Sequence, residues 1–459
     1  MAAVFSLVAL VLVGTVRLPA QDSVEARLAA LEARIQELES ELAAARGTAP
    51  VSATVPVNAT NSNLHGAFIR PAVFTSPANL TMASATAAPP AAAMAPPLQA
   101  GTPDFSGDYE GLNFFKGVKF GGFLDTYYVW DTNEPPGGLV GLRNFDFNHN
   151  SLTLSQVDFE MTKAVSESSP LGYNVQMVFG PTANLVNSGD FSVGNSTAAH
   201  FMQYYLSGKL GKATLDFGKF VTQHGAEVID TRADWNYSRG LLFSWAIPYY
   251  HTGVRATLPL SDKATIAGFL VNGWNNVVDN NKAKTLGLQA VLNPTSRISF
   301  IQNYMVGKEQ SVPSGVSSPV RHLFDSLLTV KLHDKITFMV NYDYGMDRAW
   351  GYAADGITPV DRGHVHWQGV AAYLKLQPTS WFAFTPRYEY FDDRMGFQTL
   401  TPQRVRELTL TPEFTISNNL VTRFEYRHEW SSAPAYDVSD PTDDPTRLDT
   451  IGVGMILKF

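Results

Sequence analysis

Charged side chains recur at every second position in two segments near the C-terminal end of the chain. Arg387 and Glu389 form one such run, and Arg423, Glu425 and Arg427 form the other. Positions two apart in a β-strand share one face, so each run presents its charges to the same side. Charges grouped in this way can set the selectivity of a water-filled passage, and we interpret these five residues as the wall of a lumen.

A second group of titratable residues lies in the segment 221–249, the longest connection between the strands that we predict below. Its members are His224, Glu227, Asp230, Arg232, Asp234 and Arg239. If this segment enters the lumen, these side chains face the charged wall and form the narrowest part of a pore. If the segment stays outside, the same charges are simply solvated, and this alternative remains open.

The other residues that could do chemistry form no complete site. His364 and His366 fall on one face of a strand, as metal ligands can, but the sequence offers no third ligand. Asp146, Asn148 and Asn150 resemble part of a calcium loop but lack its glycine and its closing glutamate. Nucleophile-elbow and nucleotide-binding motifs are missing from the sequence. We therefore expect no catalytic residues, no metal site, no cofactor and no enzymatic activity.

The composition favours a chain that crosses a membrane with strands rather than helices. Aromatic residues make up 12% of the 459 residues and charged residues only 17%. Beyond the N-terminus, apolar residues alternate with polar ones and form no run long enough for a helical span. Cysteine is absent, which excludes disulfides and thiol catalysis. The net charge of -8 argues against a nucleic acid partner.

From residue 116 onward the chain divides into sixteen segments of alternating hydrophobicity, separated by turn residues. We predict strands over 116–131, 151–165, 171–180, 198–209, 212–220, 250–259, 263–274, 284–293, 296–307, 320–333, 336–346, 364–377, 381–392, 403–416, 419–430 and 447–459. An even number of such strands is typical of a transmembrane barrel. The predicted fold class is all-β, an antiparallel transmembrane β-barrel of about sixteen strands, with fourteen or eighteen as alternatives.

The connections between these segments alternate between short and long. Short turns such as 260–262 and 417–418 contain the Asp, Asn or Ser residues that tight turns prefer. Long connections fall between them, including 132–150, 347–363 and 431–446. Such alternation places every short turn at one end of a barrel, together with both barrel termini, and supports a barrel over a set of independent domains.

The final strand indicates which face meets lipid. Its apolar face consists of Ile451, Val453, Met455, Leu457 and Phe459. The chain stops on a bare aromatic ring, which suits an aromatic girdle at a membrane surface. Taken alone, this strand is also compatible with the edge of a soluble sheet. Together with the other fifteen it predicts an outward face against membrane lipid and a polar inward face against water.

The N-terminal part has a different organisation. Residues 1–20 have the pattern of a signal peptide, with a membrane anchor as the alternative. Residues 21–46 are predicted to be a coiled-coil helix with the core Val24, Leu28, Leu31, Ile35, Leu38 and Leu42. Oppositely charged flanking residues favour parallel self-association, although a lone amphipathic helix is the alternative. Residues 47–115 are rich in Ala and Pro and are predicted to be a disordered linker.

Three strings carry a family resemblance: the run from Asn236 to Ala256, the run from Val271 to Asn276, and Gly122 to Tyr128. Over 116–459 the chain resembles the putative β-barrel porin-2, OmpL-like family. The resemblance implies a bacterial outer-membrane porin without catalytic residues. Because general porins of sixteen strands fold their third loop into the lumen, it also makes 221–249 the candidate constriction. By the same analogy a trimer is the expected homo-oligomer.

The predicted function is passive diffusion of small hydrophilic solutes or ions through a water-filled barrel in the bacterial outer membrane. One alternative is a channel selective for anions or phosphate, with Arg232, Arg239 and the lumen arginines as a ladder. Another is a structural tether that acts through the N-terminal coiled coil. In each case the N-terminal segment is expected in the periplasm.

Overall fold

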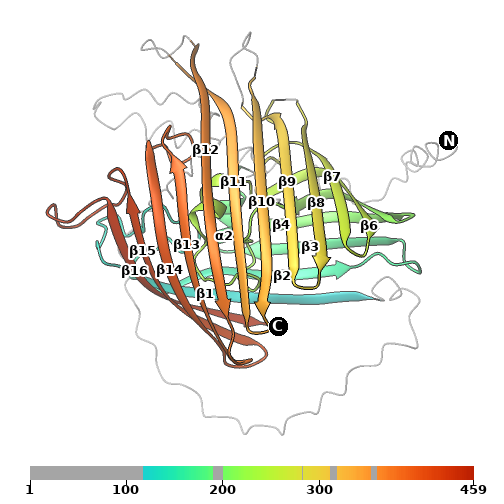
Figure 1. Ribbon diagram of the computed structural model, residues 1–459, viewed down its shortest axis with the longest axis horizontal. Coiled ribbons are helices and arrows are strands. Elements are labelled where there is room, and N and C mark those ends of the chain that lie inside the picture. Colours follow the sequence, from blue (N-terminus) through green and yellow to red (C-terminus); the bar gives the residue numbers. More distant parts are fainter. Residues whose placement is uncertain (1–116, 190–199, 282, 311–317, 353–358) are drawn as a thin grey trace, which may run out of the picture. The chain divides into compact units, whose positions relative to one another are not determined.

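The computed structural model describes residues 117–189, 200–281, 283–310, 318–352 and 359–459. In these residues sixteen antiparallel strands form one closed barrel (Figure 1). The predicted fold class and strand number are therefore confirmed. The predicted signal peptide, coiled coil and linker lie outside the described residues.

Each strand pairs with its neighbours along the chain. The first eight strands are β1 (Val118–Asp131), β2 (Thr153–Lys163), β3 (Leu171–Phe179), β4 (Phe201–Leu210), β5 (Ala213–Val221), β6 (Tyr250–Ser261), β7 (Ala264–Val271) and β8 (Thr285–Thr295). The other eight are β9 (Ile298–Lys308), β10 (Val320–His333), β11 (Ile336–Tyr352), β12 (Pro359–Leu376), β13 (Phe382–Asp393), β14 (Gln403–Thr415), β15 (Leu420–Ser431) and β16 (Arg447–Lys458). Short turns make consecutive strands antiparallel, as the alternating connections predict.

Two short helical segments lie in the described parts of the long connections. They are α2 (Pro181–Val186) and the π-helical turn η3 (Leu242–Ala246). No helix in the described part of the chain is long and apolar enough to cross a membrane.

The barrel closes between β1 and β16, which confirms the last segment as the closing strand. The Phe459 amide donates to the Gly122 carbonyl at 3.1 Å, and the Gly122 amide donates to the Phe459 carbonyl at 3.0 Å. A Cβ on Gly122 would overlap the Phe459 ring, so only glycine lets the ring lie against β1 at this point.

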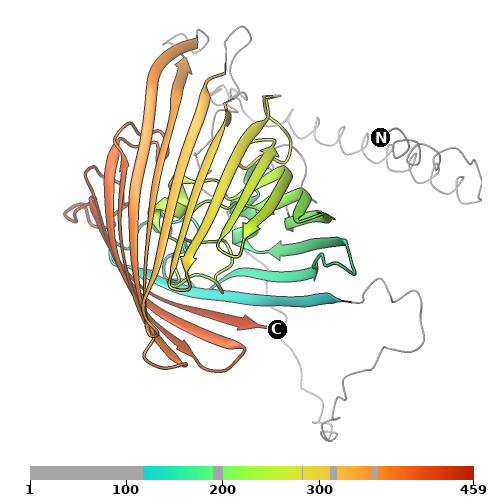
Figure 2. The same cartoon turned by 45° about the vertical axis from the view of Figure 1, so that its right-hand side comes forward.

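Strand length differs from the prediction in several places: β2 and β7 are shorter, and β11 and β12 are longer. The described parts of the predicted long loop 347–363, namely 347–352 and 359–363, instead extend β11 and β12, with Arg348 opposite His364 in the ladder. The Arg348 guanidinium donates to the Asp361 carboxylate across the two strands. Strands run from 8 residues in β7 to 18 in β12, and Figure 2 shows β11 and β12 rising furthest at the long-loop end. The backbone ladder therefore continues to Tyr352 and Pro359, past the strand ends at 346 and 364 that the alternation predicts.

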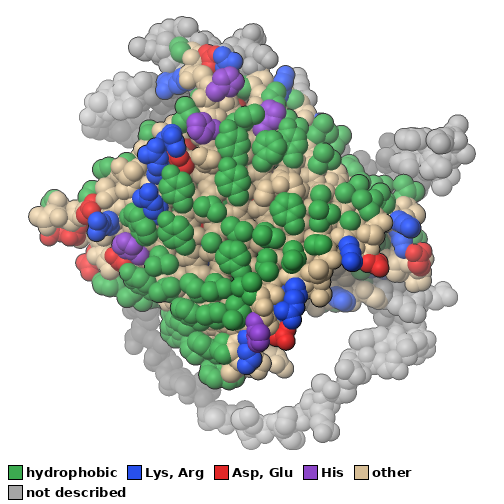
Figure 3. Space-filling model, viewed as in Figure 1, with side chains coloured by type: hydrophobic (Ala, Val, Ile, Leu, Met, Phe, Trp, Pro, Cys, Tyr) green, Lys and Arg blue, Asp and Glu red, His purple; other side chains and the backbone are tan. Residues whose placement is uncertain are grey.

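The outward face is apolar over most of its height. Phe424 is 49% exposed and Ile451 is 54% exposed, as expected for side chains whose solvent is lipid. Figure 3 shows the resulting hydrophobic surface across one side of the barrel. The outward direction predicted for the final strand is thus confirmed.

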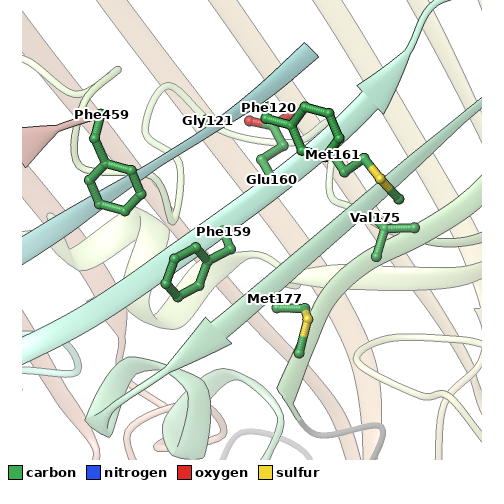
Figure 4. Close-up of a pocket in the computed structure, with 8 residues that line it drawn as sticks. All are labelled: Phe120, Gly121, Phe159, Glu160, Met161, Val175, Met177 and Phe459. Atoms are coloured by element: carbon green, nitrogen blue, oxygen red, sulfur yellow. The ribbon is translucent and has the colours of Figure 1, made fainter. Parts of the chain in front are cut away.

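A shallow apolar groove marks this face beside the closing strand. Phe120, Phe159, Met161, Met177 and Phe459 line it together with Gly121, Glu160 and Val175 (Figure 4). The rings of Phe159 and Phe459 lie 5.8 Å apart between centroids. The terminal aromatic residue therefore packs against β2 as well as β1.

Candidate pore constriction

The third loop (222–249) lies inside the barrel and is bonded to its inward face. The Glu425 carboxylate on β15 accepts the backbone amides of Tyr237 at 2.9 Å and Ser238 at 3.1 Å. The Glu389 carboxylate on β13 accepts the amides of Leu241 and Leu242 at the start of η3. Loop backbone has no strand partner, so these carboxylates satisfy amides that would otherwise be buried without a bond.

Arg387 on β13 joins the loop to two strands. Its guanidinium lies 2.5 Å from the Glu407 carboxylate on β14 and 2.6 Å from the Glu227 carboxylate in the loop. It also donates to the Ser238 carbonyl at 2.6 Å. Arg387 and Glu407 are both fully buried. Removal of Arg387 would leave Glu227 without its ion-pair partner and Glu407 with Arg427 alone, at a site where both carboxylates are buried.

Two further arginines on β15 bind loop carbonyls. Arg423 donates to the carbonyls of Thr231 at 2.7 Å and Asp234 at 2.5 Å. Arg427 donates to the Arg239 carbonyl at 2.8 Å, and its guanidinium lies 2.5 Å from the Glu407 carboxylate. The inward arginines therefore hold the loop in place through its backbone.

Asp234 and Arg239 hold the loop to itself. The Asp234 carboxylate accepts the Val228 amide at 2.9 Å and lies 3.2 Å from the Arg239 guanidinium. Arg239 also donates to the Val228 carbonyl at 3.1 Å, and its guanidinium lies over the Phe145 ring at 4.7 Å. Burial raises the pKa of the Asp234 carboxyl against the opposing effect of Arg239. Both side chains stabilise the loop and neither reaches open solvent.

His224 is also buried. Its Nδ1 lies 3.2 Å from the Thr222 hydroxyl, which lies 3.2 Å from Nε2 of His251. The His224 ring meets the Phe269 ring edge-on at 6.2 Å. Burial lowers the pKa of His224 to about 4, so the ring is neutral at pH 7 and adds no charge to the lumen.

Among the predicted loop residues, Asp230 and Arg232 are the pair that reaches water. Their side chains are 28% and 24% exposed, and the carboxylate and guanidinium lie 2.6 Å apart. The Arg232 guanidinium also lies 3.7 Å from the Glu160 carboxylate on β2 and over the Phe123 ring at 4.4 Å. This group faces the part of the lumen that is open to solvent.

The open part of the lumen lies toward the short-turn end. Inward residues there, such as Glu160, Arg255, Gln289 and Lys375, are partly exposed. Inward residues nearer the long loops are buried, including Asp125, Asn303 and Trp367. The described residues therefore pack the long-loop half of the lumen and leave the short-turn half wet.

The structure brings three of the predicted loop residues, Glu227, Asp234 and Arg239, into contact with the predicted wall residues. His224, Asp230 and Arg232 contact other parts of the protein. The predicted wall residues lie against the third loop, and their side chains are buried. Arg387 and Glu389 are fully buried, and Arg423, Glu425 and Arg427 are at most 8% exposed. Loop carbonyls and amides occupy the bonding positions that water was expected to fill.

Sequence reasoning missed several members of this network. Glu407 was detectable, because Gln403, Val405, Glu407, Thr409 and Thr411 alternate on one face of β14. The first long loop contributes Arg143 and Asp146, 2.5 Å apart and buried. Arg143 also lies 3.5 Å from Glu429 on β15. Residues in a loop have no periodicity, so no sequence signal could place these two inside the barrel.

His364 and His366, weighed above as metal ligands, lie on β12 opposite Arg348 and Met346. Within the described ranges no group of three or more His, Cys, Asp or Glu side chains is arranged to hold a metal ion.

Comparison with known proteins agrees with this architecture. The family model for putative beta-barrel porin-2, OmpL-like, matches residues 117–459. A comparison with curated proteins gave no match. The anion-selective porin from Comamonas acidovorans has a TM-score of 0.50 at 9% identity, covering 74% of this chain and 99% of that chain. Salmonella typhi OmpF in complex with daunomycin has a TM-score of 0.50 at 9% identity, with 74% and 97% covered.

At such low identity the likeness to solved structures concerns the fold alone. The family match covers most of the chain and includes the third loop and all sixteen strands. The chain therefore belongs to the putative beta-barrel porin-2, OmpL-like family and is a β-barrel channel of the bacterial outer membrane.

Proposed function

We propose that this porin lets small hydrophilic solutes and ions diffuse across the outer membrane, and that its third loop sets the limit on their passage. The observation that carries the proposal is the position of the third loop, which is bonded to the inward face of β13, β14 and β15. A loop held inside a barrel narrows the cross-section that solutes can use.

The wet half of the lumen supports a diffusion path. Partly exposed charges of both signs face it, among them Glu160, Asp230 and Arg232. The packed half supports a low conductance, because buried side chains leave less cross-section for hydrated ions. We therefore expect small conductance steps rather than those of a wide, open barrel.

The anion-selective alternative receives no support from the positions of the arginines. A ladder for anions needs guanidinium groups that solutes can reach, whereas Arg387, Arg423 and Arg427 are buried and bound to carboxylates or carbonyls. Arg232 is reachable, but Asp230 and Glu160 neutralise it. Mixed charge at this point favours weak selectivity.

The proposed orientation places the long loops outside the cell and the short turns in the periplasm. The N-terminal coiled coil would then lie on the periplasmic side and assist parallel homo-oligomer formation, with a trimer as the expected state. These assignments rest on the loop pattern and on the heptad residues of 21–46.

Planar-bilayer recordings of the purified full-length protein test the proposed function. We expect small ion-conducting steps, and Arg232→Ala should shift the reversal potential toward cations because Asp230 and Glu160 lose their partner. Lys335→Ala, an exposed lysine in the short turn after β10, is the matched control and should leave the potential unchanged. A correctly folded protein that never conducts would overturn the proposal.

A further inference from the structure

A cluster of arginines lies on the outward face of the barrel, away from the lumen. It consists of Arg394, Arg404 and Arg406 with the carboxylate of Asp392, at the long-loop ends of β13 and β14. We call it the arginine cluster. Figure 3 shows Lys and Arg side chains grouped over this end of the two strands, directly above the hydrophobic surface.

The pattern of β14 places the cluster at the boundary of the apolar zone. Along its outward face Arg404 and Arg406 are followed by Leu408 and Leu410. An arginine on the lipid face costs about 2–4 kcal/mol at the middle of a bilayer and about 0–1 kcal/mol near its surface. The change from Arg406 to Leu408 therefore marks the level where headgroups give way to hydrocarbon.

The cluster carries uncompensated positive charge. The Asp392 carboxylate accepts from Arg394 and lies 3.6 Å from the Arg404 guanidinium. The third guanidinium, that of Arg406, lies over the Tyr390 ring at 5.4 Å, and no carboxylate within the described ranges forms an ion pair with it. Three arginines against one carboxylate leave two positive charges at this surface.

The guanidinium groups are also accessible. The Arg394 and Arg404 side chains are 49% and 44% exposed, and Arg406 is exposed. By contrast, Arg387 and Arg427 inside the barrel are fully enclosed by carboxylates and carbonyls. At the long-loop ends of β11 and β12, Arg348 is matched by Asp361. The arginine cluster therefore differs from these sites in both accessibility and net charge.

The arrangement suits a phosphate group. Arg404 and Arg406 are two residues apart on one face of a strand, so their planar forks can bind the same anion or two adjacent ones. A phosphate at headgroup level would meet these forks, while its acyl chains would lie along the apolar surface below. Free phosphate would gain only the first of these contacts.

We propose that the arginine cluster binds the phosphate groups of a phosphorylated glycolipid in the leaflet on the long-loop side. The proposal rests on the orientation given above but not on conduction. It assigns to β13 and β14 a lipid-binding surface that is separate from the pore.

Binding of bisphosphorylated lipid A in mixed micelles to the full-length protein, measured by isothermal titration, tests the proposal. Arg404→Gln with Arg406→Gln should weaken binding at least tenfold. Lys331→Gln with Lys335→Gln removes two exposed lysines at the short-turn end and should leave the affinity unchanged. Heat-modifiable migration on gels confirms that each variant is folded.

The lipid itself supplies the second comparison. Dephosphorylated lipid A should bind the wild-type protein about as weakly as bisphosphorylated lipid A binds the R404Q/R406Q variant. Equal affinity of that variant and the wild type would overturn the proposal, as would equal affinity of the two lipids. Complete displacement by millimolar inorganic phosphate would instead assign the site to free phosphate and overturn the lipid assignment.

Bilayer conductance separates this inference from the proposed function. The R404Q/R406Q variant should conduct like the wild type, because neither residue contacts the lumen or the third loop. A protein that binds the glycolipid but never conducts would contradict the pore and leave the lipid site standing.

Discussion

Buried ion pairs at the centre of the barrel decide what single residues do in this protein. Burial makes a charge costly, and a close partner of opposite sign with further hydrogen bonds offsets that cost. Arg387 meets these conditions with Glu227, Glu407 and the Ser238 carbonyl. Its charge therefore serves structure, although its sequence pattern resembles that of a pore-lining residue.

Arg387→Gln should lower the free energy of unfolding by about 3–5 kcal/mol, because buried Glu227 loses its ion-pair partner and buried Glu407 keeps only Arg427. Urea unfolding of the reconstituted protein measures the change. Arg447→Gln, at a side chain that is 68% exposed, should change it by less than about 0.5 kcal/mol. Equal effects of the two substitutions would contradict the role given to Arg387.

His224 should make stability depend on pH. Its folded pKa of about 4 lies below the unfolded value, so the unfolded chain binds more protons between these two pH values. The stabilisation is present above about pH 6.5 and is lost as the pH falls toward 4. The difference in free energy of unfolding between wild type and His224→Asn should shrink by about 3 kcal/mol over this range.

Unfolding titrations at matched pH values test this dependence. His333→Asn, at an exposed histidine near the short-turn end of β10, is the control. If the difference in free energy of unfolding between wild type and H224N stays constant from pH 7 to pH 4, the pKa of His224 is not lowered in the folded state.

At the scale of elements, strands and loops follow different rules in this barrel. Strand residues are placed by their alternation, and every second one must face lipid. The third loop is placed by bonds from its backbone to carboxylates and guanidiniums on three strands. A small displacement of the third loop from the barrel wall should therefore change the conductance of the pore more than the stability of the barrel.

Gly240→Ala tests this contact between loop and wall. An added Cβ at Gly240 would overlap the Glu389 carboxylate, so the loop or this buried side chain must move, which strains the bonds between them at a cost of about 1–3 kcal/mol. We expect altered single-channel conductance with the barrel intact. Gly137→Ala is the matched control, because a Cβ there has no neighbour within 4 Å. Unchanged conductance in G240A would show that the third loop does not form the constriction.

At the scale of the whole molecule, closure of the barrel and association between chains depend on different segments. The barrel closes within one chain through β1 and β16, so folding of the described residues needs no partner chain for its hydrogen bonds. The heptad residues of 21–46 are predicted to act between chains. Deletion of the heptad segment should therefore weaken association between chains and leave the barrel folded.

Deletion of 21–46 should reduce the oligomer size in detergent while the barrel keeps its heat-modifiable migration. Light scattering after size-exclusion chromatography measures the mass of the complex. A matched deletion of 26 residues from the 47–115 linker controls for chain length and should leave the mass of the assembly unchanged apart from the missing residues. If both deletions leave the oligomer intact, the outer face of the barrel itself carries the association.

The sequence by itself determined the sixteen strands, their order and the direction of their side chains. Lipid accepts only apolar side chains on one face, so Phe424 and Ile451 had to alternate with inward residues such as Arg423 and Thr450. Hydrophobicity therefore alternates with a period of two residues along each strand, and this alternation can be recognised from the sequence alone.

Only the tertiary structure decided what the inward charges meet. The sequence indicated that Glu425 and Arg427 point inward, but nothing in 221–249 states how its backbone runs. Every loop residue except proline carries the same backbone amide and carbonyl, so the sequence does not indicate which of these groups bond to the strands. Arg143 and Asp146 come from a loop whose sequence has no periodic pattern. The inward charges are buried by contacts between segments that are far apart in the sequence, up to about 300 residues for Arg143 and Thr450. Such contacts depend on how the chain folds in three dimensions, and no local sequence pattern indicates them.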